Sequence, residues 1–552
     1  MKNQRDNSFV RQAAILATAS IIVRLIGFLY RIPLTRLIGD SGNALYAMAY
    51  QVYTFAIVMS SGTFPAAVSR LVSARIAKGE YYNAHQMFKT AMVFALIVGA
   101  IAALFMGLGA NHIALFLSSA DQNNAEYNEI AAFVYSGSDR NDAALAIRAL
   151  APTVVFVAML ATLRGYFQGM KTALPTAVSQ VAEQIFNVIF TVLLAYILFD
   201  AVNIRYSVAG AAAGTGIGVV AGLIVLLFLY ALVAKDLRKR AIRDRHNRRE
   251  SKGRQLSALL VTALPMIIGM GIFSVSSLID IRMGNSRMLA SGAFTSDEVR
   301  VLMGQFLGKF VLLTTLPVSL SMALSAAVIP EITASSVNMD TAAVRHKTNM
   351  ALRLSMILSV PSAVGLAVLA DPILLLLFPD LPGGGVLLRV GSVSIIFMAL
   401  VHVPTGILQG LGHVRLPIIA AFFGVAVKIP VNYVLIYNQY INIVGAVIST
   451  ILCYVVASAI NMYFLYRRTR ILPSLSGALV KPVMAATGMG MVCYVVYYTL
   501  IIFVGNAVST IAALCAGIMA YLLFMCIIRG FCKSDLQALP LPRKVRRWMQ
   551  EL

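Results

Sequence analysis

The sequence predicts an all-α integral membrane protein of about fourteen transmembrane helices, with two pseudo-symmetric six-helix lobes and two C-terminal helices. Three observations predict this fold. Of the 552 residues, 59% are hydrophobic and only 12% are charged, about half the charged share of soluble domains. Apolar runs of roughly 20 residues, the length that crosses about 30 Å of hydrocarbon, recur throughout the chain. Several motifs of the first half reappear in the same order in the second half.

Each long apolar run is interpreted as one membrane span. The first half has spans at 9–30, 44–66, 86–117, 146–167, 174–199 and 208–233. The second half has spans at 256–281, 305–329, 345–377, 386–408, 416–437 and 443–466, and two more follow at 477–504 and 507–530. The first run carries Arg24 and no small-residue cleavage site follows it, so it is expected to be a span and not a removed signal peptide.

These spans divide the chain into five segments. The segments are an N-lobe (1–233), a basic loop (234–255), a C-lobe (256–466), a final helix pair (467–530) and a basic tail (531–552). Ten Lys and Arg residues lie between Lys235 and Arg254, whereas the loop 118–145 holds five acids and one Arg. Since basic loops mark the cytoplasmic side, both termini are expected to be cytoplasmic. The exceptions on the outer side are Arg31, Arg36, Arg282, Arg287 and Arg300. The net charge of +23 is thus interpreted as topology and attraction to anionic lipids, and not as nucleic-acid binding.

The clearest repeat begins with a Gln-Gly pair. Gln168-Gly169 is followed by Pro175 and a helix with Glu183 and Asn187; Gln409-Gly410 is followed by Pro417 and a helix with Lys428 and Asn432. In each copy the two polar residues lie four apart, so the pattern predicts an acid, Glu183, at the position where the second copy has a base, Lys428. Ala66-Ala67-Val68 similarly reappears as Ala326-Ala327-Val328, and Val208-Ala209-Gly210-Ala211 resembles Ile443-Val444-Gly445-Ala446. An even number of spans precedes each repetition, so the halves insert in parallel. Two such lobes can rock against each other, which is the geometry of alternating access.

Placing a charged residue inside a span costs free energy, so such residues mark candidate functional positions. The candidate residues of a central cavity are Arg24, Glu183, Asn187, Lys309, Lys428 and Asn432. Other charges, Arg164 among them, lie nearer to span ends and are expected to reach the headgroups. Glu183 and Lys428 are expected to face each other across the cavity. Two interpretations stay open: a polar floor that binds an anionic headgroup, and a structural bridge that joins the lobes.

The remaining motifs indicate a transporter and no enzyme. Pro265 with Gly269 and Gly271 is the expected hinge, since such residues permit bending. There is no P-loop, no G-x-S-x-G and no H-E-x-x-H motif, so no catalytic residues are assigned. The five cysteines form no C-x-x-C pair, and neither a metal site nor a cofactor is expected. Coupling to the membrane potential or to an ion is left open.

Several motifs resemble one family of membrane transporters. They are Ser20-Ile-Ile-Val-Arg24-Leu-Ile-Gly27-Phe28, Arg36-Leu-Ile-Gly39, Leu408-Gln409-Gly410 and Val444-Gly445-Ala446. The chain resembles the MurJ-type lipid II flippases, in particular a polysaccharide biosynthesis branch similar to stage V sporulation protein B. These belong to the multidrug/oligosaccharidyl-lipid/polysaccharide (MOP) exporter superfamily, which also includes MATE-type exporters.

The resemblance implies that Arg24 meets the pyrophosphate of lipid II and that the helices of 467–530 form a groove for the lipid tail. Other members use a further Arg in span 2 and one in span 8; this chain has none within 37–69, and Lys309 is the nearest base in span 8. Some members bind sodium near spans 7, 11 and 12. Lys428 on span 11 would compete with that ion, so no sodium site is expected here.

We therefore expect a multi-pass flippase of the bacterial plasma membrane that moves lipid II outward. It would supply the precursor for peptidoglycan synthesis, on which the cell wall and cell shape depend. Expected partners are the lipid-linked oligosaccharide, anionic lipids and the cell-wall synthesis machinery, and the protein is expected to be a monomer. The alternatives are a MATE-like exporter of drugs or small solutes, a flippase for another polyprenyl-linked polysaccharide, and a membrane glycosyltransferase. The last would need clustered carboxylates near one membrane face, and none are found.

Overall fold

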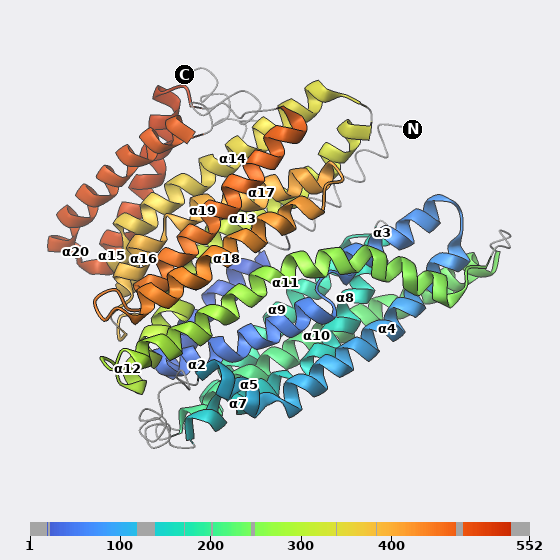
Figure 1. Cartoon of the computed structure of the whole chain (residues 1–552), viewed down its shortest axis with the longest axis horizontal. Helices are drawn as coiled ribbons and strands as arrows, with labels where there is room; N and C mark the ends of the chain where they lie inside the picture. Colours follow the sequence, from blue (N-terminus) through green and yellow to red (C-terminus); the bar gives the residue numbers. More distant parts are fainter. Residues whose placement is uncertain are drawn as a thin grey trace. The chain divides into compact units, whose positions relative to one another are not determined.

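The computed structural model describes residue 19 and residues 22–118, 138–170, 172–199, 203–243, 249–337, 339–381, 383–470 and 479–530. Over these residues the chain forms helices and no strands (Figure 1). Residues 9–18 of the first span, the acids from Asp121 to Glu129 and the basic tail lie outside the described residues. Contacts divide the chain into two compact units, Met1–Gly304 and Gln305–Leu552, and each unit is described by itself.

The first unit starts with a helix over 22–29 that continues into α2. The helices that follow are α2 (Arg31–Ser60), α3 (Phe64–Ala77), α4 (Tyr81–Leu108), α5 (Ala110–Ser118), α7 (Ser138–Leu150), α8 (Thr153–Gly169), α9 (Leu174–Ile197), α10 (Ile204–Arg243), α11 (Lys252–Ala290) and α12 (Ser296–Gly304). On α4, Val93, Ile97 and Ile101 recur every four residues and are exposed, which is the pattern of a lipid-facing stripe.

Gly39 separates the first two spans. It lies inside α2 with φ +69°, a left-handed conformation that favours glycine and interrupts the helix. The first span therefore continues to Ile38, beyond its predicted end at residue 30. The prediction ended it too early because Arg31 and Arg36 resemble the polar flank of a span, whereas the backbone stays helical until the glycine.

The described part of the second unit contains a π-helical turn, η1, and eight α-helices. They are η1 (Gln305–Phe310), α13 (Val311–Val337), α14 (Thr341–Val368), α15 (Ala370–Leu377), α16 (Gly385–Gly391), α17 (Ser394–Gly410), α18 (Arg415–Tyr437), α19 (Val444–Thr469) and α20 (Lys481–Ile527). Gly505 divides α20 into two parts. The break at Gly505, where φ is +75°, falls where the sequence predicts the boundary between the last two spans.

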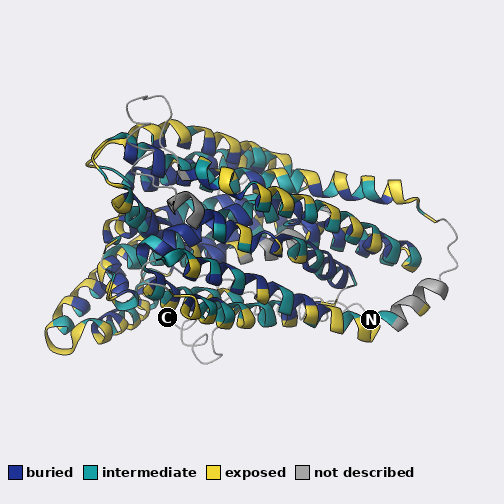
Figure 2. Cartoon of the chain, turned by 90° about the horizontal axis from the view of Figure 1, so that it is seen from below, coloured by how far each residue is buried: buried dark blue, intermediate teal, exposed yellow. Residues whose placement is uncertain are grey.

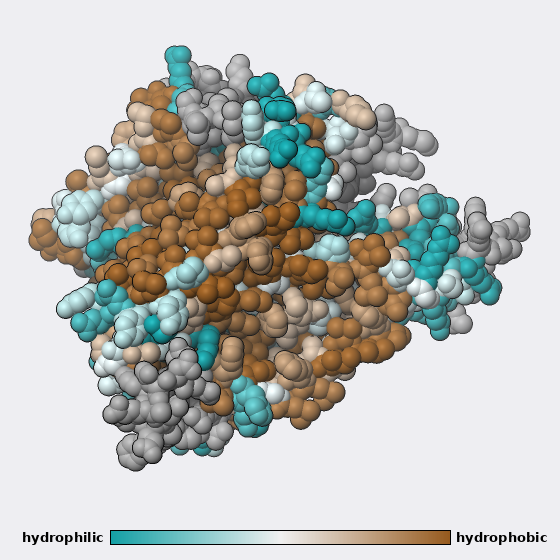
Figure 3. All heavy atoms as spheres, in the orientation of Figure 1, coloured by the Kyte–Doolittle hydropathy of each residue, from teal (hydrophilic) through white to brown (hydrophobic). Residues whose placement is uncertain are grey.

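The all-α membrane fold is confirmed. Among the described residues, 11 helices are long and apolar enough to cross a membrane, or up to 12 if the bent pair α16 and α17 is one span. The count of fourteen stays a prediction, since the first span is only partly described and α20 is counted once. Apolar side chains cover the middle of the helices and polar ones gather toward helix ends (Figure 3), and most exposed residues lie on outward helix faces (Figure 2).

Equivalent helices of the two halves pack alike. A Cβ atom placed on Gly165 of α8 would lie 3.0 Å from the Pro65 carbonyl oxygen of α3, and one on Gly406 of α17 would lie 2.8 Å from the Ser325 carbonyl oxygen of α13. Pro65 and Ser325 each directly precede the repeated Ala-Ala-Val motif. In each half the fifth and sixth helices of the repeat also pack together, as α9 with α10 and as α18 with α19. The repeat is thus present in the packing as well as in the sequence.

The contact units differ from the predicted segments in one respect. The sequence assigns 256–281 to the C-lobe, whereas α11 and α12 pack against α2 inside the first unit. These contact units do not test the predicted segment boundaries, which all stay predictions. The core of the first unit lies among α3, α4, α8 and α10, where the rings of Phe88 and Tyr166 stack 4.2 Å apart.

Candidate functional site

Arg24 lies on the helix that precedes α2. Its side chain is exposed, and among the described residues no carboxylate forms an ion pair with it. Gly27 follows one turn later, and a Cβ atom placed on it would lie 3.1 Å from Nε2 of Gln184 on α9. Since residues three apart share one side of a helix, Arg24 lies on the side of its span that adjoins α9.

Glu183 of α9 pairs with Arg164 of α8. Arg164 Nη2 lies 2.6 Å from Glu183 Oε2, and Arg164 Nε donates to Ser179 Oγ over 3.1 Å. The exposed fractions of the two charged side chains are 14% for Arg164 and 25% for Glu183. The prediction that Arg164 reaches the headgroups is wrong, because a carboxylate on the neighbouring helix holds its guanidinium. Arg164 lies five residues before the end of α8 and Glu183 nine residues after the start of α9, so their distances from the link between the helices did not single out the pair.

Asn187 and Glu183 lie where α9 approaches a row of glycines on α10. Cβ atoms placed on Gly218 and Gly222 would lie 2.6 Å from Asn187 Cβ and 2.8 Å from Glu183 Cβ. Thr191 Oγ1 donates to Asn187 Oδ1 over 2.8 Å. Close backbone approach through glycine is a usual way to join membrane helices, and here it fixes the depth of both polar side chains.

The packing register corrects the predicted correspondence between the halves. A Cβ atom placed on Gly210 would lie 2.7 Å from the Leu194 carbonyl oxygen, and one on Gly445 would lie 2.8 Å from the Leu435 carbonyl carbon. Counting seven residues back from each leucine equates Asn187 with Lys428. Glu183 is therefore not the counterpart of Lys428. The shared i, i+4 spacing of the polar residues suggested that Glu183 matches Lys428. The contacts of α9 with α10 and of α18 with α19 determine the register instead.

In the second unit, both predicted lysines are buried. Lys428 of α18 is 3% exposed, and Asn432 one turn later accepts a hydrogen bond from Ser449 of α19. Lys309 of η1 is 0% exposed; its Nζ donates to the Leu381 carbonyl oxygen over 2.8 Å and lies 5.6 Å from the centre of the Phe378 ring. Lys309 thus holds the segment after α15. That Glu183 and Lys428 face each other across a cavity stays a prediction.

Arg31 is a residue that sequence reasoning did not select. Its Cζ lies 5.2 Å from the centre of the Tyr50 ring. Tyr46 stacks on Tyr50 at 6.1 Å and hydrogen-bonds Thr215 Oγ1 of α10 over 3.2 Å. Tyr53 lies 5.7 Å from Tyr50 on the other side. The spacing of these tyrosines, which places them on one helical face, was the available signal.

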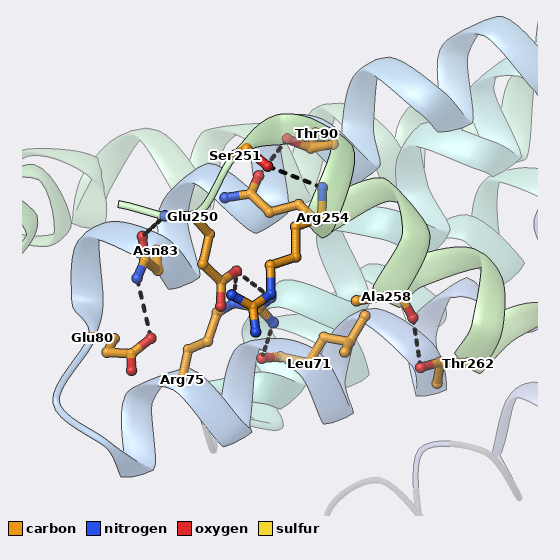
Figure 4. A network of polar contacts seen from close by, with 11 residues as sticks. Leu71, Arg75, Glu80, Asn83, Thr90, Glu250, Ser251, Arg254, Ala258 and Thr262 are labelled. Atoms are coloured by element: carbon orange, nitrogen blue, oxygen red, sulfur yellow. Dashed lines mark hydrogen bonds and ion pairs between the residues drawn. The ribbon is translucent and has the colours of Figure 1, made fainter. Parts of the chain in front are cut away.

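The start of α11 is fixed to α3 and α4 by a polar network (Figure 4). Arg75 Nε donates to Glu250 Oε2 over 2.9 Å, and the Glu250 backbone N–H donates to Asn83 Oδ1 over 3.2 Å. Farther along α11, Pro265 and Gly269 lie within a continuous helix, and Gly271 packs against the Met59 side chain of α2. The close packing accounts for Gly271, and the hinge stays a prediction.

Comparison with known families identifies the chain. A family model described as polysaccharide biosynthesis protein matches residues 9–336, more than half of the sequence. The chain belongs to the polysaccharide biosynthesis protein family. A second family model, MatE, matches residues 303–434. Together with the relatives below, these matches place this family member in the MOP exporter superfamily.

Two relatives from Bacillus subtilis (strain 168) resemble this family member over most of their length. The uncharacterized membrane protein YabM is 26% identical over 546 residues, covering 98% of this chain and 96% of YabM. Lipid II flippase MurJ is 26% identical over 474 residues, covering 84% and 83%. A solved lipid II flippase MurJ in its inward closed conformation shares the fold, with a TM-score of 0.64 at 14% identity over 93% of this chain and 98% of that one. These relatives support a multi-pass membrane transporter of the flippase type.

The first unit of this family member contains Arg24, Arg31, the Arg164–Glu183 pair and Asn187. Lys309, Lys428 and Asn432 lie in the second unit. Among the described residues no group of His, Cys, Asp or Glu is arranged to hold a metal ion.

Proposed function

We propose that the protein is a flippase that moves lipid II, the undecaprenyl-pyrophosphate-linked peptidoglycan precursor, from the inner to the outer leaflet of the plasma membrane. Arg24 carries the proposal. It is a cation within a span, it adjoins the polar row of α9, and no described carboxylate pairs with it. The similarity to a protein named lipid II flippase MurJ supports this class of substrate.

A guanidinium suits the diphosphate group of such a lipid. Its N–H donors form short, charge-assisted hydrogen bonds with phosphate oxygens, often in pairs. The pairing of Glu183 with Arg164 compensates the acid that would otherwise repel the substrate. Asn187, Asn432 and Lys428 are proposed to line the cavity between the lobes. Lys309 is proposed to stabilise the chain near Leu381 and not to bind substrate, because that carbonyl already accepts a hydrogen bond from its ammonium group.

In the proposed cycle the lobes rock about the Pro265, Gly269 and Gly271 region while the lipid tail stays in the bilayer beside the helices of 467–530. Both termini lie in the cytoplasm in this proposal, where the basic loop and tail meet anionic lipids. The protein acts as a monomer beside the cell-wall synthesis machinery. A membrane potential can bias the cycle, since one charge moved across about 100 mV is worth about 2.3 kcal/mol.

The match to the MatE model favours a second candidate, a MATE-like exporter of drugs or small solutes. An exporter of cations needs an acid-dominated cavity. Among the candidate cavity residues the acid is Glu183, and it is paired with Arg164. Arg24 and Arg31 form an ion pair with no described carboxylate. The charge balance therefore favours an anionic substrate. A flippase for another polyprenyl-linked polysaccharide would also carry an anionic substrate, so the charge balance favours it equally. The two flippases would differ only in the glycan.

The test is depletion of the protein in a cell that lacks other flippases, with direct measurement of lipid II in the outer leaflet. We expect lipid II exposure to fall on depletion and to return with the intact chain. Unchanged exposure would overturn the lipid II assignment. Arg24→Ala is expected not to restore exposure; if it restores a normal rate, the role of Arg24 is wrong. Arg24→Lys separates charge from bidentate geometry, because lysine keeps the charge and lacks the planar fork.

A further inference from the structure

Helix α11 stands between the two halves of the sequence repeat. With six spans in each half, α11 is the counterpart of the first span. The first span approaches α9 of its own half, where Gly27 meets Gln184. The start of α11 contacts α3 and α4 of the other half instead, and it does so inside the first unit. Any rocking of the two halves must therefore bend α11 or open this contact.

The centre of the contact is a shielded ion pair (Figure 4). Arg75, in the last turn of α3, donates from Nη1 to the Leu71 carbonyl oxygen over 3.0 Å. Its Nε and Nη2 donate to Glu250 Oε2 over 2.9 and 2.5 Å. The side chains of Arg75 and Glu250 are 9% and 22% exposed. This pair thus fixes the residue that directly precedes Ser251, the N-cap of α11.

Uncharged side chains extend the contact along α4. The Glu250 backbone N–H donates to Asn83 Oδ1 over 3.2 Å, and Asn83 Nδ2 donates to Glu80 Oε2 over 3.1 Å. Two turns further along α4, Thr90 Oγ1 donates to Gln255 Oε1 over 2.7 Å. Asn83 and Gln255 are both buried, so these polar groups are satisfied by one another. We call this set of residues the α11 latch: Arg75, Asn83, Thr90, Glu250 and Gln255.

Beyond the latch, the first part of α11 has one packed face. Leu259 and Ala263 are buried in the core of the first unit, whereas Val261 and Leu264 are exposed. Pro265 follows and has no N–H, so the Val261 carbonyl oxygen receives no backbone hydrogen bond from it. A helix bends most readily where such a bond is missing. The part of α11 before Pro265 can therefore turn away from α3 and α4 once the latch opens.

An ion pair of this kind costs little to open when both charges reach water. Burial takes hydration from both charges, and this loss offsets much of their attraction. When the two side chains return to water together, each regains its hydration. Removing one partner is different, because the other charge then stays buried without compensation. The Arg75–Glu250 pair therefore suits a contact that opens and closes repeatedly.

We propose that the α11 latch is releasable, and that each transport cycle requires the start of α11 to leave α3 and α4 and to return. This inference rests on the proposed flippase function. Arg75 and Glu250 are positioning residues in this scheme, because they set the place of α11 and touch no substrate. The closed latch holds the start of α11 against the first half of the repeat, and the open latch frees it to follow the second half.

The first test measures the latch without transport. Spin labels are attached to Lys78→Cys and Arg249→Cys, two exposed positions beside Arg75 and Glu250. The full-length chain that carries them has its five native cysteines replaced by alanine. Pulsed electron paramagnetic resonance of the protein in proteoliposomes gives the distribution of distances between the labels. We expect a short and a long distance, both populated. A single distance that Glu250→Gln leaves unchanged would overturn the latch.

Two variants sharpen this measurement. Glu250→Gln removes the charge that holds Arg75 and is expected to raise the ratio of long to short distances about tenfold or more, as loss of a hydrogen bond to a charged group implies. Arg70→Gln is the matched control, because Arg70 is an exposed arginine of the same helix, five residues before Arg75. Its ratio is expected to stay within about twofold of that of the unmodified chain. An equal shift in both variants would overturn the role of the ion pair.

The second test asks whether transport needs the latch to open. A cleavable bis-maleimide joins the two introduced cysteines, and lipid II flipping in proteoliposomes is compared before cross-linking, after it and after cleavage of the linker. A monofunctional maleimide is the control for modification alone. We expect the cross-link to lower the rate about tenfold or more, as for other gated motions, and cleavage to restore it.

The two tests separate the latch from the function. A normal flipping rate with the cross-link intact would overturn the latch and leave the flippase function standing. Absence of flipping by the unlinked chain, with two label distances that respond to Glu250→Gln, would overturn the function and leave the latch.

Discussion

The helix pairs α9–α10 and α18–α19 share a register but differ in polarity. Gly210 and Gly445 meet equivalent leucines, which equates Gly214 with Ser449 and Asn187 with Lys428. The first pair achieves its close contact with glycines on α10. In the second pair the equivalent positions hold Ser449, Cys453 and Ala457, and Gly424 of α18 makes the close approach instead. The repeat therefore preserves the distance between the helices and not the residues that permit it.

The Arg164–Glu183 ion pair has no counterpart at the equivalent positions of the second unit. Glu183 corresponds to Gly424, and Arg164, four residues before Gln168, corresponds to Thr405, four residues before Gln409. Thr405 Oγ1 accepts a hydrogen bond from Asn461 Nδ2 over 3.1 Å. Both charges are replaced together, as expected if neither is tolerated inside the membrane without the other. The asymmetry between the lobes thus involves the whole pair and is not a simple exchange of an acid for a base.

The largest expected effect on stability comes from adding a side-chain atom where α9 and α10 are in close contact. Gly214→Ala would place a Cβ atom against the Thr191 backbone, which cannot move aside without separating the helices. We expect a loss of about 2–3 kcal/mol in the free energy of unfolding. Ser449→Ala, at the equivalent position, removes the hydroxyl group that hydrogen-bonds Asn432 and the Ala446 carbonyl oxygen, and it is expected to cost about 1 kcal/mol. Thermal unfolding of the full-length protein in detergent measures both.

Gly253→Ala is the matched control, because nothing lies within 4 Å of a Cβ atom placed on this helical glycine. It is expected to be neutral or slightly stabilising. Equal melting temperatures for Gly214→Ala and Gly253→Ala would show that the α9–α10 contact has room for a Cβ atom on residue 214.

The second effect is the coupling between Arg164 and Glu183. Glu183→Gln and Arg164→Met each leave one partly buried charge without its partner and are each expected to cost about 2 kcal/mol. The double variant is expected to lose clearly less than the sum of the two. Unfolding measurements on the four proteins give the coupling energy directly. Additive losses would mean that the two side chains act independently, against the paired replacement seen in the second unit.

The sequence predicted those features that the bilayer determines directly. Apolar runs located the spans, and their gap at Gly505 coincides with a break in the structure. The Gln-Gly and Ala-Ala-Val motifs made the repeat visible, and the packing of Gly165 and Gly406 beside the second motif was found only in the structure. Pairings between spans were not predictable in this way. Whether Arg164 meets Glu183 or a lipid headgroup depends on helix rotation and depth, and one charged residue in an apolar run determines neither.

The smallest expected effect on stability concerns an ion pair of the second unit. Arg389 of α16 pairs with Asp371 of α15, with side chains 57% and 63% exposed. Exposed pairs are screened by water and salt and typically contribute less than about 1 kcal/mol. Asp371→Asn should therefore change the melting temperature only slightly, and the difference should shrink further in high salt. A loss as large as that of Glu183→Gln would show that exposure does not separate the two pairs, and the contrast between the units would then rest on helix packing alone.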